Sequence, residues 1–174
     1  MSRIVTVTGH RPKYLKEGYS QATFNTLVEI AEIWLSKEQP DLIYSGAALG
    51  FDLACIQACL NLNIPFTAAV PFKNQDDKWS VKQQLEYRKL LTYAKKVVYV
   101  DELTDLQYLV KNSKPGLYNP YKLLLRNKWM IDQCTEVLAL WNNKCEGGTY
   151  QAVKYAESKG LTVNNLWSKY ELNN

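Results

Sequence analysis

Short β-branched segments alternate with amphipathic helical segments along almost the whole chain, and this alternation constrains the fold more than any other feature. The segments expected to form strands are residues 4–8, 41–44, 66–70, 97–100 and 137–140, with 161–163 as a terminal edge strand. Those expected to form helices are residues 21–35, 51–60, 80–93, 119–133 and 149–159. A sustained β-α-β-α order predicts a three-layer α/β fold, in which right-handed crossovers build a mostly parallel central sheet of five or six strands with helices on both faces.

Several helix starts carry local signals. Ser80 opens an S-x-x-Q capping box, and Asn119 followed by Pro120 supplies an N-cap and a first-turn proline. Thr149 is expected to cap the last long helix. Residues 101–118 are long for an ordinary connection, and the sequence leaves open whether they hold a short helix, a lid or a partner contact.

Length and composition bound the class of protein. A chain of 174 residues with 47% hydrophobic content has the size of one domain, so we expect residues 1–174 to form a single unit. No segment approaches the roughly 20 apolar residues that span a bilayer, and the N-terminal apolar stretch is too short for a signal sequence. We therefore expect a cytoplasmic protein without a membrane partner. The net charge of +4 is scattered and forms no basic run, so a nucleic-acid partner is not indicated.

The cysteines and the histidine do not form a metal site. The four cysteines show no C-x-x-C spacing, and the chain has one histidine. Cys55 and Cys59 are spaced as two buried apolar residues of one helix. We therefore expect no metal and no resident cofactor.

Glycine-bearing loops follow three of the expected strands, at residues 8–12, 45–52 and 146–149. The carboxyl ends of parallel strands lie at one edge of a sheet, so the three loops should meet there. A helix N-terminus offers unpaired N–H groups and a partial positive charge, which makes it a cradle for phosphate. The backbone positions expected to bind a ligand are Gly9, Ser45, Gly46, Ala47, Gly50, Gly147, Gly148 and Thr149.

Side chains near these loops complete the candidate site. Arg11 offers a fork of donors to a phosphate, and it is a stronger candidate than His10, because a lone histidine is usually a hydrogen-bonded structural residue. Asp52 lies in a first helical turn, where it serves either as a cap or as a ribose contact. Trp79 packs in the core or covers a nucleobase.

Arg126 is expected on the apolar side of its helix, beside Met130. An arginine there must find an anion or reach water. The sequence leaves two readings open: Arg126 neutralises a ligand, or it pairs with a carboxylate such as Asp132 or Glu86.

With these residues identified, the chain resembles the YpsA-like family of the SLOG superfamily, relatives of the DprA and LOG proteins. The matching segments are Thr8-Gly9-His10-Arg11-Pro12, Ser45 to Asp52, Pro71-Phe72 with Gln75 and Trp79, Arg126-Asn127 with Met130 and Asp132, and Gly147-Gly148-Thr149. The resemblance covers nearly the whole chain and implies a Rossmann-like fold that holds a nucleotide or a derivative such as AMP, ADP-ribose or an NAD-related molecule. One departure is Ala47, where such loops often carry a second glycine; its methyl group is tolerated if φ is negative.

The LOG-type phosphoribohydrolases offer a sharper comparison, since they use an arginine in R-K-x-x-M and a glutamate in G-G-x-G-T-x-x-E. Arg126 and Met130 resemble the first motif, with Asn127 in place of its lysine. Ala152 occupies the glutamate position of the second. Because alanine can neither accept a proton nor stabilise an oxocarbenium-like centre, the resemblance implies that LOG chemistry lacks a principal residue here.

Three functions stay open on the sequence. The leading one is binding of a nucleotide-derived small molecule by a sensor, carrier or sequestering module, with phosphates on the N–H groups of residues 46–50 and 147–149. The second is hydrolysis of an N-glycosidic bond, with Asp52 or Glu86 assisting water. The third, by analogy with DprA, is a module for single-stranded nucleic acid or a protein partner, although no interleaved aromatic and basic stripe is visible. A homodimer is compatible with each.

Overall fold

Six parallel strands form the centre of the structure, a computed structural model that describes residues 2–16 and 18–173. Their order is β4-β3-β2-β1-β5-β6. The strands are β1 (Ile4–Gly9), β2 (Leu42–Ser45), β3 (Phe66–Val70), β4 (Lys96–Tyr99), β5 (Glu136–Leu140) and β6 (Thr162–Asn165). Every residue of β3 is buried, as expected for a parallel strand covered on both faces.

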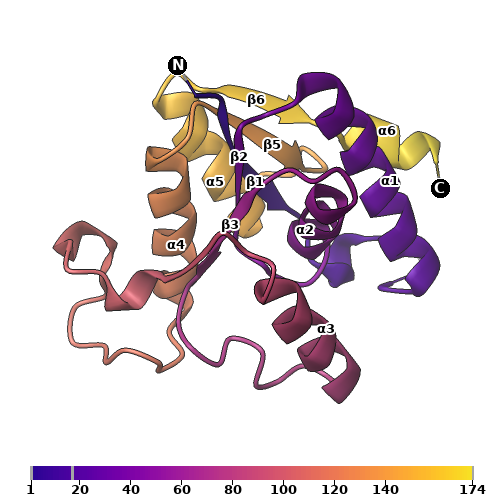
Figure 1. Ribbon diagram of the computed structural model, residues 1–174. Coiled ribbons are helices and arrows are strands. Elements are labelled where there is room, and N and C mark those ends of the chain that lie inside the picture. Colours follow the sequence, from indigo (N-terminus) through magenta and orange to yellow (C-terminus); the bar gives the residue numbers. More distant parts are fainter. Residues whose placement is uncertain (1, 17, 174) are drawn as a thin grey trace.

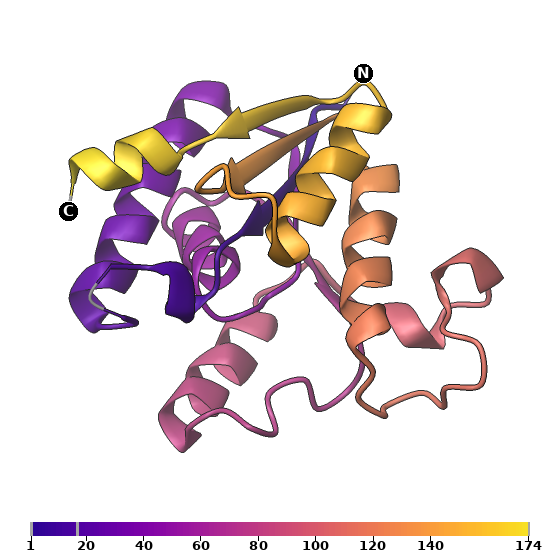
Figure 2. The ribbon, with the colours of Figure 1, turned by 180° about the vertical axis from the view of Figure 1, so that it is seen from behind.

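Helices cover both faces of the sheet (Figures 1 and 2). One face carries α1 (Gln21–Glu38), α2 (Phe51–Asn61), α3 (Val81–Leu91) and the short α6 (Trp167–Leu172). The other carries α4 (Pro120–Asp132) and α5 (Gly147–Ser158), which pack side by side. The Rossmann-like, three-layer fold expected from the sequence is thereby confirmed. Among the described residues, no helix is both long enough and apolar enough to cross a membrane.

The direction of strand addition reverses at β1. From β1 the chain adds β2, β3 and β4 on one side, and then returns to place β5 on the other side of β1. Val7 pairs with Leu138 and Gly9 with Leu140 in this register. The carboxyl ends of β1 and β5 therefore form the topological switch point, where open α/β sheets hold their ligands.

The helix starts largely follow the local signals. Ser80 and Gln83 form the expected capping box, and the Asn119 side chain accepts a hydrogen bond from the backbone N–H of Tyr121. The expectation that Thr149 caps the last long helix is wrong, because α5 already begins at Gly147 and Thr149 lies inside its first turn. Helix α6 was not expected at all.

Two 3-10 turns, Val100–Glu102 and Leu106–Tyr108, lie at the start of and within residues 101–118. This segment extends away from the sheet beyond the N-terminal end of α4 (Figure 1). A buried ion pair anchors this segment: Lys122 Nζ lies 2.8 Å from Asp101 Oδ2, and both side chains are only 3% exposed. The same ammonium donates to the carbonyls of Lys114 and Leu117. Since one buried cation satisfies several acceptors of the loop, the segment has a defined course despite its length.

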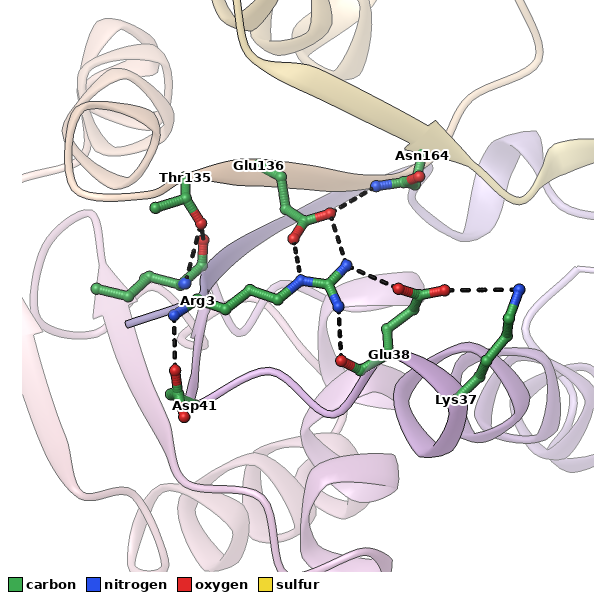
Figure 3. Close-up of polar contacts among 8 residues, drawn as sticks. Arg3, Lys37, Glu38, Asp41, Thr135, Glu136 and Asn164 are labelled. Carbon is green, nitrogen blue, oxygen red and sulfur yellow. Dashed lines mark hydrogen bonds and ion pairs between the residues drawn. The ribbon is translucent and has the colours of Figure 1, made fainter. Parts of the chain in front are cut away.

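Arg3 joins three elements at the edge of the sheet opposite the switch point (Figure 3). Its guanidinium donates to the carboxylate of Glu136 at the start of β5, and to the backbone and carboxylate of Glu38 at the end of α1. Asn164 of β6 donates to the same Glu136 carboxylate. Hydrogen bonds from Arg3 lower the pKa of Glu38.

We expect Arg3→Ala to lower the free energy of unfolding by about 1–2 kcal/mol, because it leaves the largely buried Glu136 carboxylate with fewer donors. Urea denaturation monitored by circular dichroism measures the change. The matched control is Lys82→Ala, which breaks an exposed i,i+4 pair with Glu86 and should change stability by less than about 0.5 kcal/mol. Equal effects of the two substitutions would contradict the assignment.

Candidate functional site

A cavity of about 490 Å³ lies at the switch point between β1 and β5. We call it the switch-point cavity. The sequence-predicted residues that line it are Gly9, Arg11, Asp52, Arg126, Gly147, Gly148 and Thr149. The structure thus brings together residues from β1, α2, α4 and α5 that are far apart in the sequence. The volume of the cavity is in the range of small-molecule sites.

The N-terminus of α5 forms one wall of this cavity. Gly147, Gly148 and Thr149 are the first three residues of the helix, and no side chain of a described residue caps them. Gly147 has a φ of 82°, a backbone conformation that favours glycine. The first-turn N–H groups and the positive end of the helix dipole are therefore available to an anion.

Arg126 of α4 forms the opposite wall, and it is almost completely buried. Its Nη1 donates to the carbonyl oxygen of Gly46 at 2.5 Å and to that of Ala69 at 3.3 Å. Glycine is required at position 46, because a Cβ there would lie 1.8 Å from Arg126 Nη1 and 2.7 Å from Asp52 Oδ2. Gly46 therefore makes room for a charged pair instead of offering its own N–H to the cavity.

The electrostatics of this pair follow from burial. Desolvation lowers the pKa of Arg126 to about 10, while the nearby Asp52 carboxylate acts in the opposite direction. Desolvation also raises the pKa of Asp52, against the influence of Arg126. Neither of the carboxylates considered from the sequence pairs with Arg126. The Asp132 carboxylate accepts hydrogen bonds from Lys159, Tyr108 and Tyr155. Glu86 pairs with Lys82 on α3.

Asn127 connects Arg126 to α5. Its Oδ1 accepts a hydrogen bond from Arg126 Nε at 2.8 Å, so its Nδ2 donor points away from that bond, toward Gly148. The sequence analysis gave Asn127 as part of a segment that matches the family and as a departure from a lysine motif, but not as a ligand-binding residue. Its position beside a candidate arginine was the signal that could have identified it as a cavity residue.

Arg11 lies on the exposed rim of the switch-point cavity, and its guanidinium forms no hydrogen bond or ion pair with another part of the described chain. Lys13 and Tyr14, which the sequence reading missed, line the cavity from the same turn. Their proximity to Arg11 in the Pro12–Tyr14 turn was the available signal. The cationic residues Arg11, Lys13 and Arg126 outnumber Asp52, the acidic residue of the lining.

The loop between β2 and α2 supports the site from behind. Ser45 Oγ accepts from the N–H of Ala47 and donates to the carbonyl of Asp52, so it is fully used within the loop. Ala47 is buried, and its φ of 51° places its backbone in the left-handed region, not at the negative φ considered from the sequence. Gly50 has φ of 103°, and a Cβ at this position would lie 2.5 Å from the carbonyl oxygen of His10. From residues 45–50, Ala48 lines the cavity, whereas Ser45, Gly46, Ala47 and Gly50 shape it.

His10 does not line the switch-point cavity. It is 3% exposed, packs against the rings of Tyr14 and Trp167, and its Nε2 accepts the N–H of Asn142 at 2.9 Å. Desolvation lowers its pKa below 6.5. The structural reading of the histidine therefore fits its surroundings, in which it joins the ends of β1 and β5.

We expect acid to destabilise the fold through His10. Its folded pKa is depressed, so the unfolded chain binds more protons below about pH 6.5; the stability it contributes is complete above that pH and is lost as the pH falls. Unfolding free energies measured between pH 7.5 and 5.5 should fall. The variant His10→Gln, which cannot titrate, should show a flatter profile, and an unchanged profile would count against this role.

Trp79 lies outside the switch-point cavity. It lines a second cavity of about 310 Å³, which shares Arg11, Ala48 and Leu123 with the first. Its ring meets Tyr87 edge to face at 5.1 Å and also packs on the core, so it is half-buried. Trp79 therefore packs against the core, and the nucleobase contact considered for it stays a prediction.

Comparisons with known proteins agree with this architecture. The SPbeta prophage-derived protein YoqJ of Bacillus subtilis (strain 168) is 32% identical over 147 residues, which cover 81% of this chain and 83% of that protein.

Among solved structures, the chain is similar to DNA processing protein A (DprA) of Streptococcus pneumoniae, with a TM-score of 0.59 and 17% identity over 94% of this chain and 50% of that one. DNA processing protein A of Helicobacter pylori, described with a single-stranded DNA binding mode, gives a TM-score of 0.61 and 16% identity over 94% and 64% of the chains. The chain thus spans between half and two thirds of the DprA chains, and at these identities the likeness concerns the fold.

The YpsA family model, described as the YspA SLOG family, matches residues 5–168. This range includes β2 to β6, all of β1 but its first residue, the β1–β5 switch point and both walls of the cavity. The chain therefore belongs to the YspA SLOG family.

Proposed function

We propose that the protein binds a nucleotide-derived ligand through a phosphate held in the switch-point cavity, and that it acts as a sensor, carrier or sequestering module. One observation carries the proposal: the uncapped N-terminus of α5 and the arginines 11 and 126 line the same cavity. Membership of the SLOG family, which suggests a nucleotide-related ligand, supports it.

Each group has a distinct part in this proposal. The N–H groups of Gly148 and Thr149 donate hydrogen bonds to phosphate oxygens at the end of the helix axis. Arg11, free of other partners in the described chain, approaches from the rim and supplies a bidentate fork. Arg126 is held in place by carbonyls and by Asn127, so it contributes a fixed positive charge with little reorganisation.

Isothermal titration calorimetry with AMP, ADP-ribose and NAD tests the proposal. We expect at least one of them to bind below millimolar concentration, and inorganic phosphate to compete with it. Affinity should fall as salt rises, since charged groups dominate the contact. An absence of binding to all three at millimolar concentration would overturn the proposal.

The second candidate function, hydrolysis of an N-glycosidic bond, is favoured by one observation. Asp52 is a buried carboxyl group in the lining of the cavity, and its raised pKa suits a proton-transfer role. Glu86, the other carboxylate considered from the sequence, lies on α3 in a different groove.

Incubation with nucleoside monophosphates and NAD, monitored for free base, tests this activity. If it exists, Asp52→Asn should abolish base release while ligand binding persists. No release beside an active LOG-type control would remove the hydrolase from consideration.

A further inference from the structure

The switch-point cavity does not end at Arg11. The second cavity shares three lining residues with it, Arg11, Ala48 and Leu123, so the two cavities adjoin at these residues. One ligand can therefore reach from the N-terminus of α5, past Arg11, into the second cavity.

The walls of the second cavity differ in character from those of the first. Phe72, Trp79 and Tyr118 line it, so a planar apolar group would meet aromatic surface there. Tyr118 meets Phe72 edge to face at 5.9 Å, yet it remains 65% exposed. An exposed tyrosine ring beside a cationic junction is suited to stack a nucleobase.

The position of Tyr118 is fixed by the fold. Gly116 and Tyr118 belong to the segment that the buried Lys122–Asp101 pair closes; the N–H of Gly116 donates to the same Asp101 oxygen as Lys122, at 2.8 Å. The carbonyl of Leu117, next to Tyr118, accepts from the Lys122 ammonium. The buried ion pair therefore holds Gly116 and Tyr118 in place, and both residues line the second cavity. Residues 101–118 thus contribute to the wall of this cavity.

Gln75 adds a polar group to this wall. Its Nε2 donates to the Tyr87 hydroxyl at 3.0 Å and lies near the carbonyls of Gly46 and Ala47. Its Oε1 has no hydrogen-bond partner among the described residues, so it is an acceptor available to a base amino group.

We propose that the ligand is a nucleoside 5′-phosphate that spans both cavities, with its phosphate on α5, its ribose beside Arg11 and its base against Tyr118 and Phe72. This inference rests on the proposed function, and it narrows the ligand class from any nucleotide-derived molecule to a nucleoside 5′-phosphate whose base lies in the second cavity. Phosphate and base are then recognised by separate parts of the protein.

Calorimetry with AMP and with ribose 5-phosphate, which lacks the base, tests the inference. In the unaltered protein AMP should bind at least about tenfold more tightly than ribose 5-phosphate, in line with the strength of base–aromatic stacking. Tyr118→Ala should reduce this ratio to near one while leaving the affinity for ribose 5-phosphate unchanged. Tyr118→Phe should retain the ratio, because the ring and not the hydroxyl makes the contact.

The matched control is Tyr93→Ala, at another exposed tyrosine that lies in the groove between α1, α2 and α3, and it should leave both affinities unchanged. Equal affinities for AMP and ribose 5-phosphate in the unaltered protein, or a Tyr118→Ala variant that weakens both alike, would overturn the two-cavity ligand while the phosphate site stands. If neither molecule binds but ADP-ribose or NAD does, this inference fails and the proposed function stands; if none of them binds, both fail.

Discussion

Gly148→Asp is expected to weaken binding of AMP or ADP-ribose by about 100-fold while the fold keeps its stability. The space beyond Gly148 is open, since the nearest atom to an added Cβ is Asn127 Nδ2 at 4.0 Å, so the side chain fits. Its carboxylate would accept the first-turn N–H groups of α5 and repel a phosphate there. An acid in the first turn also interacts favourably with the helix dipole, so the unfolding free energy should stay equal or rise.

Gly148→Ala is the matched control, because it adds the Cβ without the charge. It should change ligand affinity by less than about threefold, since the methyl group would make only an ordinary van der Waals contact, with Asn127 Nδ2 at 4.0 Å. Calorimetry and thermal denaturation of both variants separate the effect of charge from that of shape. If Gly148→Asp binds the nucleotide as tightly as Gly148→Ala does, the N-terminus of α5 is not the phosphate site.

Gly46→Ala is expected to be severely destabilising, by about 3 kcal/mol or more. The new methyl group would lie 1.8 Å from Arg126 Nη1 and 2.3 Å from its Cζ, so the guanidinium must leave its place. That movement breaks its hydrogen bonds to the carbonyls of Gly46 and Ala69 and leaves Asp52 buried without its neighbouring charge. Nucleotide binding should be lost with the position of Arg126.

Urea denaturation of Gly46→Ala, beside Gly148→Ala, measures this effect on two glycines of the same site. The methyl group of the first substitution would overlap a buried cation, and that of the second would make only an ordinary van der Waals contact. A Gly46→Ala variant within about 0.5 kcal/mol of the unaltered protein would show that Arg126 is not held against this glycine. Binding can then be measured on whichever variants remain folded at the working temperature.

The elements of the fold were largely predictable, because buried parallel strands and capped helices leave local signals. Residues 66–70 were expected as a strand and form β3, and Ser80 begins α3 through the expected capping box. The start of α5 was misplaced by about two residues, since Gly147 begins the helix without a capping side chain. Helix α6 is six residues long and packs on α1, so tertiary contact and not local sequence determines it.

The meeting of distant residues at the site was predictable from topology. Glycine loops after parallel strands must lie at one edge of the sheet, and the structure brings Gly46 and Gly148 to opposite sides of Arg126 and Asn127. Which loop residues face the cavity was not predictable. Ser45 and Ala47 turn inward because their hydrogen bonds and left-handed φ fix the turn, and these depend on the three-dimensional path of the chain.

In the second cavity, Phe72, Gln75 and Trp79 belong to a segment that the sequence singled out, whereas the contribution of Tyr118 had no signature in the sequence. Tyr118 lies at this cavity because residues 101–118 fold back toward the site. This course depends on the ion pair of Lys122 in α4 with Asp101, twenty-one positions earlier. Such a pair cannot be distinguished from scattered surface charge in a sequence where Lys and Arg total 21. Irregular segments held by one buried contact are therefore where reading from the sequence reaches its limit.

The strand order has a consequence for when the site comes into being during synthesis. β5 inserts beside β1, although some 130 positions separate them, and α5, which lines the switch-point cavity, follows β5. A ribosome-bound chain that has emerged only as far as α4 can pair β1 to β4 but has no second wall. If the proposed ligand binds at this site, its capture reports that the last quarter of the polypeptide has joined the first strand, so an added nucleotide should rescue chains stalled late in maturation and leave earlier intermediates unaffected.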